Sequence, residues 1–209
     1  MQVNQRGSDD RRVSTQGPQA HEFLVAEVFQ CNACRLCLSG GLRVVYRGLL
    51  DAKLMLVGEA PGEIEAQRGV PFVGLSGRLL SRIMAHAEVP EDRLYITNMV
   101  KCQPPANRDP TDDELRSCRS FLQRQLALVK PKVVLAAGRA ATMALTATRG
   151  PMNVLLEQDD LCCYGDKNIP VVPMYHPAYL LRRLKEPGAR EVFRDTLTRI
   201  KLAWQKANE

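Results

Sequence analysis

Long apolar runs are missing from this sequence, and their absence excludes an integral membrane protein. No stretch approaches the roughly 20 consecutive apolar residues that a membrane-spanning helix requires. The first residues, MQVNQRGSDDRRVSTQGPQ, are polar and lack the apolar centre of a secretory signal. We therefore expect a disordered tail over residues 1–19, one folded domain over residues 20–209, and a protein that stays in the cytoplasm.

Nucleotide-binding motifs are also absent. The glycine-rich loop after the first predicted strand contains neither the P-loop pattern GxxxxGK(S/T) nor the dinucleotide fingerprint GxGxxG. It shows no internal repeat and no low-complexity segment. Its 209 residues suit a single domain with one hydrophobic core.

The charge balance is basic. Lys and Arg number 29 against 23 Asp and Glu, which gives a formal net charge of +6. Such a surplus favours a polyanionic partner through Coulomb attraction. Many basic proteins bind no nucleic acid, so charge alone leaves both alternatives open.

Four short apolar segments predict the core of the fold. Each is typical of a buried strand, and predicted helices separate them, which indicates a parallel sheet with helices on both faces. The expected architecture is a three-layer αβα domain with a central four-stranded parallel sheet. Two segments before the last strand, MNVLLEQ and LCCYG, are expected to pair as a hairpin. The strands are expected at 53–58, 94–100, 132–138 and 169–177, and the helices at 20–30, 78–89, 111–130, after Gly138, and at 188–207.

The carboxyl ends of these strands predict the place of a ligand site, because ligands of parallel sheets gather there. The glycine-rich loop over residues 57–80 is the most informative of them. Glu59, Glu63 and Glu65 bring three carboxylates to this crevice, where one of them can polarise a water. The alternative is that they are solvated, which we prefer for Glu63. Phe72 suits either the core or a platform on which a base stacks.

Cysteine spacing indicates a metal or cluster site, since disulfides are rare in the cytoplasm. Cys31 and Cys34 form a CxxC pair, and Cys102 and Cys118 lie far downstream. Four thiolates from separate segments can hold a zinc ion or a four-iron cluster. Small buried core cysteines are the alternative, and Cys37 offers a further local ligand.

The adjacent pair Cys162 and Cys163 falls in a segment that we expect to be a strand. Neighbouring residues of a strand point to opposite faces, so the two thiols suit packing better than one shared site.

At this point four motifs together resemble one family, the family 4 (iron–sulfur) uracil-DNA glycosylases. The resemblance runs in order from about residue 28 to residue 203, nearly the whole folded chain. Its motifs are CNAC, GEAPGEIEAQRGVPFVGLSG, TNMVKCQPPANRDPTDDELRSC and HPAYLLR. It implies an enzyme that flips uracil out of DNA and hydrolyses the N-glycosidic bond, which starts base excision repair.

The resemblance also implies a cofactor, a four-iron–four-sulfur cluster that serves structure rather than redox chemistry. Its ligands would be Cys31, Cys34, Cys102 and Cys118, and Cys37 would stay outside.

The same resemblance implies roles in the pocket. The backbone at Glu59 and Ala60 contacts a uracil carbonyl, Phe72 stacks on the base, and Asn98 reads its polar edge with a donor and an acceptor. His176 donates to the oxygen that becomes negative as uracil leaves.

Two departures from the family pattern matter. Ala66 stands where the family often has an acidic residue, so Glu65 becomes the preferred carboxylate for positioning water, with Glu59 as its rival. The segment 102–108 is short and has no histidine, whereas a sister group that attaches covalently to DNA carries a longer, basic, histidine-bearing loop. We therefore expect an enzyme that turns over.

The third motif suggests a DNA-contacting segment. Tyr179, Leu180 and Leu181 would fill the gap left by the flipped base, and Arg182 and Arg183 would hold phosphates. The alternative is an ordinary loop that enters a helix. We expect a monomer that acts on uracil-containing DNA, single- or double-stranded. It would associate with the nucleoid through DNA.

Two other classes of function remain in view. One is an electron-transfer protein that uses the same cluster, and the other is a zinc-stabilised DNA-binding module without catalysis. The large α/β core argues against a small ferredoxin. The iron or zinc content of the protein would distinguish an iron–sulfur cluster from a zinc site.

Overall fold

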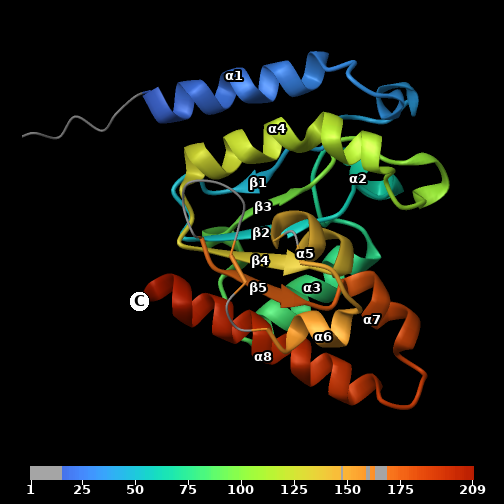
Figure 1. Cartoon of the computed structure of the whole chain (residues 1–209), viewed down its shortest axis with the longest axis vertical. Helices are drawn as coiled ribbons and strands as arrows, with labels where there is room; N and C mark the ends of the chain where they lie inside the picture. Colours follow the sequence, from blue (N-terminus) through green and yellow to red (C-terminus); the bar gives the residue numbers. More distant parts are fainter. Residues whose placement is uncertain (1–15, 147, 159–160, 163–168) are drawn as a thin grey trace, which may run out of the picture.

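A computed structural model describes residues 16–146, 148–158, 161–162 and 169–209 (Figure 1). Its centre is a five-stranded sheet in the order β1-β3-β2-β4-β5. The four predicted strands are confirmed and run parallel, while β1 is a two-residue antiparallel edge strand that carries no apolar pattern by which the sequence predicts it. The strands are β1 (Arg47–Gly48), β2 (Leu54–Gly58), β3 (Tyr95–Asn98), β4 (Val133–Ala137) and β5 (Val171–Met174).

Helices cover both faces of the sheet, as the alternating sequence pattern predicts. Short 3-10 turns lie at residues 35–38, 91–93 and 105–107. None of the described helices is long and apolar enough to cross a membrane. The helices are α1 (Gln16–Gln30), α2 (Glu63–Arg68), α3 (Leu75–His86), α4 (Asp112–Val129), α5 (Arg139–Thr146), α6 (Met152–Leu156), α7 (Pro177–Arg183) and α8 (Ala189–Asn208).

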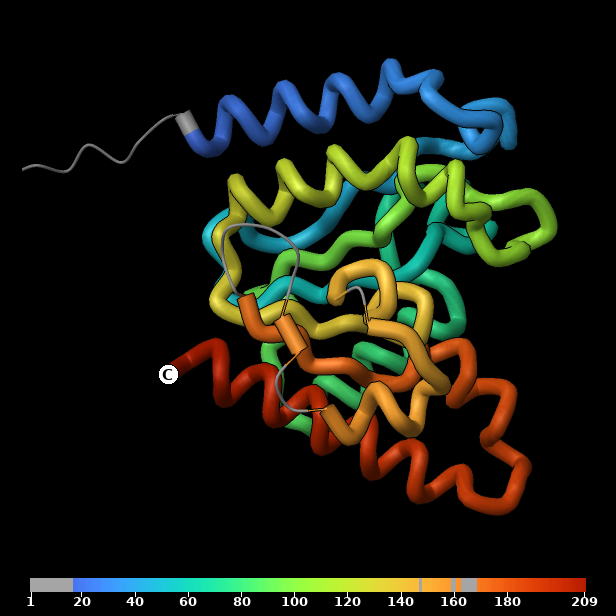
Figure 2. Tube along the Cα trace, in the orientation of Figure 1, coloured from blue at the N-terminus to red at the C-terminus, as the bar shows by residue number. Residues whose placement is uncertain are grey.

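Alternation along the strands divides the core into two layers. Leu54 and Leu56 of β2 face the layer that α3 and α8 complete, whereas Met55 and Val57 face α4 and α5. Strands buried on both faces are mainly apolar, and every residue of β2 to β5 is buried, including the polar Thr97 and Asn98 at the end of β3. Helix α1 lies outside α4 and packs against it through a third, smaller apolar cluster (Figure 2).

Two expectations need correction. Helix α1 begins at Gln16, so residues 16–19 are helical and not part of a tail, and residues 1–15 lie outside the described residues. The first half of the expected hairpin is helix α6, because Pro151 stands at its N-cap and Leu155 and Leu156 turn into the core. In the second half, Cys162 makes only an isolated bridge to Pro170, and Cys163 lies outside the described residues.

The start of α4 confirms its predicted cap. The Thr111 side chain accepts from the Glu114 amide, and the Glu114 carboxylate accepts from the Thr111 amide, which is a complete capping box. Arg108 donates to both oxygens of the same carboxylate, at 2.7 and 2.8 Å. This hydrogen-bonded pairing lowers the pKa of Glu114 to about 2. The loop before α4 is therefore fastened to the helix by one buried carboxylate.

We predict that Glu114→Gln lowers the free energy of unfolding at pH 7 by about 1 kcal/mol, the usual worth of a helix cap. The folded pKa lies below the ordinary value, so the ionised carboxylate stabilises the fold above about pH 4.5, and this contribution is lost as pH falls toward 2. Urea unfolding at pH 7 and pH 3 measures the difference, which should shrink at the lower pH. Asp113→Asn is the control, because Asp113 pairs with Arg116 at an exposed site and should leave stability unchanged. An equal cost at both pH values would contradict the assignment.

Candidate active site

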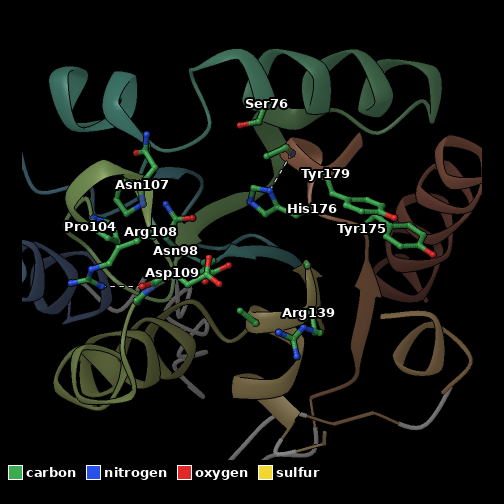
Figure 3. Close-up of a pocket in the computed structure, with 18 of the residues that line it drawn as sticks. Ser76, Asn98, Pro104, Asn107, Arg108, Asp109, Arg139, Tyr175, His176 and Tyr179 are labelled. Atoms are coloured by element: carbon green, nitrogen blue, oxygen red, sulfur yellow. Dashed lines mark hydrogen bonds between the residues drawn. The ribbon is translucent and has the colours of Figure 1, made fainter. Parts of the chain in front are cut away.

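A pocket of about 790 Å³ opens at the carboxyl ends of the parallel strands. The loops after β2, β3, β4 and β5 all contribute to its wall, as the sheet topology predicts. Figure 3 shows His176 and Asn98 projecting toward the same space from different strands. The structure brings together all the residues expected to meet or act on the base: Glu59, Ala60, Glu65, Phe72, Asn98 and His176.

The floor of the pocket requires a glycine at position 58. A Cβ atom there would lie 2.4 Å from Asn98 Oδ1 and 2.6 Å from Phe72 Cζ, which no real contact permits. Phe72 has a φ of 56°, in the left-handed region that a bulky residue rarely adopts. This backbone turn brings the ring under the pocket, with its centroid 6.1 Å from that of His176. The ring packs on the core, as one of the two alternatives expected, and it also lines the pocket, whereas stacking on a base stays a prediction.

Asn98 is the last residue of β3 and is 2% exposed. Its main-chain carbonyl accepts hydrogen bonds from Lys101 and Thr97. Within the described residues its carboxamide has no partner, so both its donor and its acceptor are available to a ligand.

His176 is the N-cap of α7, and this geometry decides its tautomer. The Nδ1 atom accepts from the Ala178 amide at 3.1 Å, so the proton of the neutral ring is on Nε2. Burial, aided by the nearby Arg182 cation and opposed by Glu65, lowers the pKa of His176 to about 4. At neutral pH the ring is therefore an uncharged donor.

The carboxylates of the glycine-rich loop have different environments. Glu65 is 7% exposed, and its Oε1 accepts from the amides of Val73, at 3.0 Å, and Gly74, at 2.8 Å. This carboxylate joins α2 to the start of α3. Burial, and then repulsion from Asp109, raises the pKa of Glu59. Glu63 is exposed, as expected.

The segment after His176 departs from expectation. Leu180 is 2% exposed and packs in the core, so its side chain cannot enter DNA from this position. Tyr179 stacks on Tyr175 with ring centroids 5.4 Å apart. Arg183 donates to the Tyr179 hydroxyl and pairs with Glu186.

The other two residues of this segment keep their side chains nearer the surface. Arg182 is exposed at the pocket rim, and Leu181 is half-buried.

Some residues of the pocket wall were not predicted from the sequence. Arg139 follows Gly138, directly after the end of β4. A position at the end of a predicted strand could have identified it as a pocket residue. Asn107 and Asp109 come from the proline-rich loop, and no pattern marks them. Asn107 has a φ of 53°, and this left-handed turn cannot be read from the letters around it.

A second cavity collects the cysteines expected to form a cluster site. Cys31, Cys34, Cys37, Cys102 and Cys118 line it, between the end of α1, the loop after β3, and α4. Cys102 lies within electrostatic range of Cys118, Cys34 and Cys31, and Cys37 is not among its charged neighbours. The cavity therefore brings all five of these cysteines to one place.

The chemistry of these thiols fits a bound cluster. Burial raises the pKa of Cys102 to about 12 and also raises that of Cys118, so the thiolates need a cation to hold them ionised. No three His, Cys, Asp or Glu side chains of the described chain lie close enough to hold a single metal ion. Cys102 nevertheless interacts electrostatically with three other thiols, those of Cys118, Cys34 and Cys31.

Arg43 adds an independent sign of an anionic occupant. Its terminal nitrogen donates to the carbonyls of Cys31, at 3.4 Å, and Cys37, at 3.3 Å. Its buried Nε–H finds no acceptor among the described residues. Its cation acts on Cys102. A buried donor without a partner beside four thiols fits a negatively charged group in this cavity.

Comparisons with known proteins agree with this geometry. Residues 46–205 match the family model described as the Uracil DNA glycosylase superfamily. A Type-4 uracil-DNA glycosylase of Sulfurisphaera tokodaii is 35% identical over 185 residues, which cover 86% of this chain and 83% of the relative. One of Thermotoga maritima is 36% identical over 174 residues, 83% of this chain and 90% of the relative. A Type-5 uracil-DNA glycosylase of Pyrobaculum aerophilum is 31% identical over 149 residues, 64% of each chain.

We predict that the His176 ring stays neutral, with its proton on Nε2, from pH 8 down to about pH 5. Nitrogen NMR of the ring measures both the tautomer and the midpoint, and His176→Asn assigns the signals. Because the folded pKa of about 4 lies below the ordinary 6.5, the unfolded chain takes up more protons between these values, and stability falls as pH falls through that window. A midpoint near 6.5, or a proton on Nδ1, would show that the N-cap bond to Ala178 does not persist.

Proposed function

Because this chain belongs to the uracil DNA glycosylase superfamily, we propose that the pocket at the strand ends binds flipped uracil and that its residues divide the chemistry of excision. The protein is a monofunctional DNA glycosylase that hydrolyses the N-glycosidic bond of uracil in DNA, leaves an abasic site, and so starts base excision repair. One observation carries the assignment of roles: Phe72, Asn98 and a neutral His176 converge on one pocket.

Base recognition is assigned to the floor and the end of β3. Uracil must leave the duplex stack to reach the pocket, at a cost of a few kcal/mol. The Phe72 ring supplies an apolar face for the base, and the unpartnered Asn98 carboxamide supplies a donor and an acceptor for its polar edge. The main chain at Glu59 and Ala60 lies in the wall and is assigned a uracil carbonyl.

Departure of the base is assigned to His176. Cleavage leaves negative charge on uracil, and the Nε2–H of the neutral ring is a fixed donor for the oxygen that receives it. A donor of this kind is worth about 3 kcal/mol in a pocket from which water is excluded.

Water positioning and stabilisation of the cationic sugar are assigned to Glu65. Two backbone amides hold its Oε1, which leaves Oε2 for a water. Oε2 lies toward Gly62, where an added Cβ would come within 2.8 Å of it. Glu59 is the rival, because it lines the same pocket and is half-buried.

The DNA surface is assigned to the pocket rim. Arg182 is exposed there and suits a phosphate, while Tyr179 and Leu181 are the remaining candidates for the gap left by the flipped base. We propose that Arg183 contributes to the same surface through its contact with Tyr179. The enzyme is proposed to act as a cytoplasmic monomer on uracil in single- or double-stranded DNA.

The cysteine cavity is assigned a four-iron–four-sulfur cluster held by Cys31, Cys34, Cys102 and Cys118. When bound, the cluster supplies a rigid anionic crosslink between loops and takes no part in the hydrolysis. The chain's own residues bring it next to the pocket, because Cys102 follows Asn98 by only four positions.

We predict about four irons per chain and the broad visible absorbance of an iron–sulfur protein. Cys118→Ala should lose iron and solubility before it loses chemistry, since the cluster holds loops rather than substrate. Cys37→Ala is the matched control, because that thiol lines the same cavity without belonging to the assigned set. Stoichiometric zinc in place of iron, or bleaching by the control alone, would contradict the ligand assignment.

We predict that His176→Ala and Glu65→Ala each slow uracil release about 10²–10³-fold, the usual effect of losing one transition-state contact. Single-turnover cleavage of a uracil oligonucleotide, read as alkali-labile strand breaks, measures this loss. DNA affinity should change little, because both groups act as charge develops. On DNA that contains 5-fluorouracil, a better leaving group, His176→Ala should recover more than Glu65→Ala.

Glu63→Ala is the control for these variants, since its carboxylate is exposed on the same helix as Glu65. Equal rescue of the two active-site variants by 5-fluorouracil would remove the reason for giving them different roles. If Glu65→Ala releases uracil at the full rate, the role of positioning the water would be assigned to Glu59.

A further inference from the structure

The buried ammonium of Lys101 lies between the pocket and the cysteine cavity. The side chain is 1% exposed, and Nζ donates to Thr97 Oγ1 at 2.9 Å, to Gln125 Oε1 at 2.7 Å, and to the Asn98 carbonyl. All three of its hydrogens therefore have acceptors. One of those acceptors belongs to the residue assigned to read uracil.

The surrounding network fixes the position of this ammonium. Gln125 Nε2 donates to the Val45 carbonyl at 3.2 Å and to the Tyr95 hydroxyl at 2.8 Å. His21 of α1 completes the chain of bonds at 2.8 Å from the same hydroxyl. The network thus joins α1, β3 and α4 behind the pocket, and Lys101 has one defined place in it.

The charge of Lys101 lacks a carboxylate partner. Its three acceptors are a hydroxyl, an amide and a carbonyl, and none of the described residues forms a salt bridge with it. An isolated buried cation is costly, so buried charges are normally paired. The ionisable side chain that acts on it is Cys118 of the cluster cavity, and the Lys101 amide donates to the same thiol.

We propose that Lys101 is a positioning residue that couples the cluster to uracil recognition. Its charge and its main-chain amide interact with Cys118, and its ammonium donates to the Asn98 carbonyl. This inference rests on the proposed cluster and on the proposed role of Asn98. The anionic cluster supplies the counter-charge that the ammonium lacks. The ammonium in turn fixes the end of β3, from which the Asn98 carboxamide reaches the base.

The coupling predicts a specific functional loss. A displacement of about 1 Å in a positioned group can cost about 10²-fold in rate. Lys101→Met keeps an unbranched side chain but removes the charge and all three donors. We expect its single-turnover rate of uracil release to fall about 10²-fold, with unchanged affinity for DNA that contains an abasic site.

A double-mutant cycle with Asn98→Ala tests whether Lys101 acts through Asn98. If it does, adding Lys101→Met to Asn98→Ala should slow release less than about threefold further, because the positioned group is already gone. A loss that multiplies in the double variant would overturn the proposal and leave Lys101 as a general support of the fold. The matched control is Lys201→Met, which makes the same substitution at an exposed lysine of α8 that lines neither cavity, and it should release uracil at close to the parent rate.

Cluster retention is the second measurement and does not depend on activity. In the presence of an iron chelator, Lys101→Met should lose its visible absorbance several times faster than the parent and Lys201→Met. Equal rates of loss would overturn the link to the cluster. Should Lys101→Met not fold, Lys101→Gln, which keeps a donor but no charge, replaces it with the same two expectations. A parent protein without iron would refute the proposed cluster, whereas the cycle with Asn98 would still report on the pocket.

Discussion

Parallel pairing of β2 to β5 is the constraint on which the rest of this molecule depends. Strands buried on both faces carry few polar side chains along their length, and Tyr95 and Thr97 of β3 are engaged in the buried network behind the pocket. The polar groups that a ligand can reach therefore lie at the strand ends. Since the four strands run the same way, their carboxyl ends meet at one edge. Gly58, Asn98, Gly138 and His176 arrive there from four separate parts of the sequence.

Close packing then shapes the pocket at that edge, which we propose binds the base. Gly58 admits Asn98 and Phe72, and Gly138 admits His176, whose Cβ would lie 2.9 Å from an added Cβ. At Gly77 an added Cβ would lie 2.0 Å from the Phe72 carbonyl oxygen, so α3 can approach the loop that holds the ring. The glycines therefore act by letting backbone and side chains approach, which fixes the geometry of the binding groups.

The sequence predicts the fold because the signals are local. Apolar runs mark the four strands, and Thr111 with Glu114 marks the start of α4. It predicts the contents of the pocket through strand ends and motifs, and the structure brings those residues together. It fails where long-range packing decides, since the core position of Leu180 and the helical state of Met152–Leu156 depend on what those residues meet. The left-handed turn at Phe72 has no local signature, since bulky residues rarely adopt that conformation.

Pre-oriented groups line the pocket proposed for the base, and electrostatics explains why the histidine among them is neutral. A protonated His176 would be a buried positive charge beside a uracil that is still neutral. The neutral ring avoids this desolvation cost and still donates from Nε2. The N-cap bond to Ala178 holds that tautomer without a charged partner. At Glu65 two backbone amides already orient Oε1, so in the proposed role little reorganisation remains when the sugar becomes cationic. Folding has therefore already oriented the groups assigned to the uracil. Their interactions can strengthen as charge appears on cleavage, without further rearrangement of the protein.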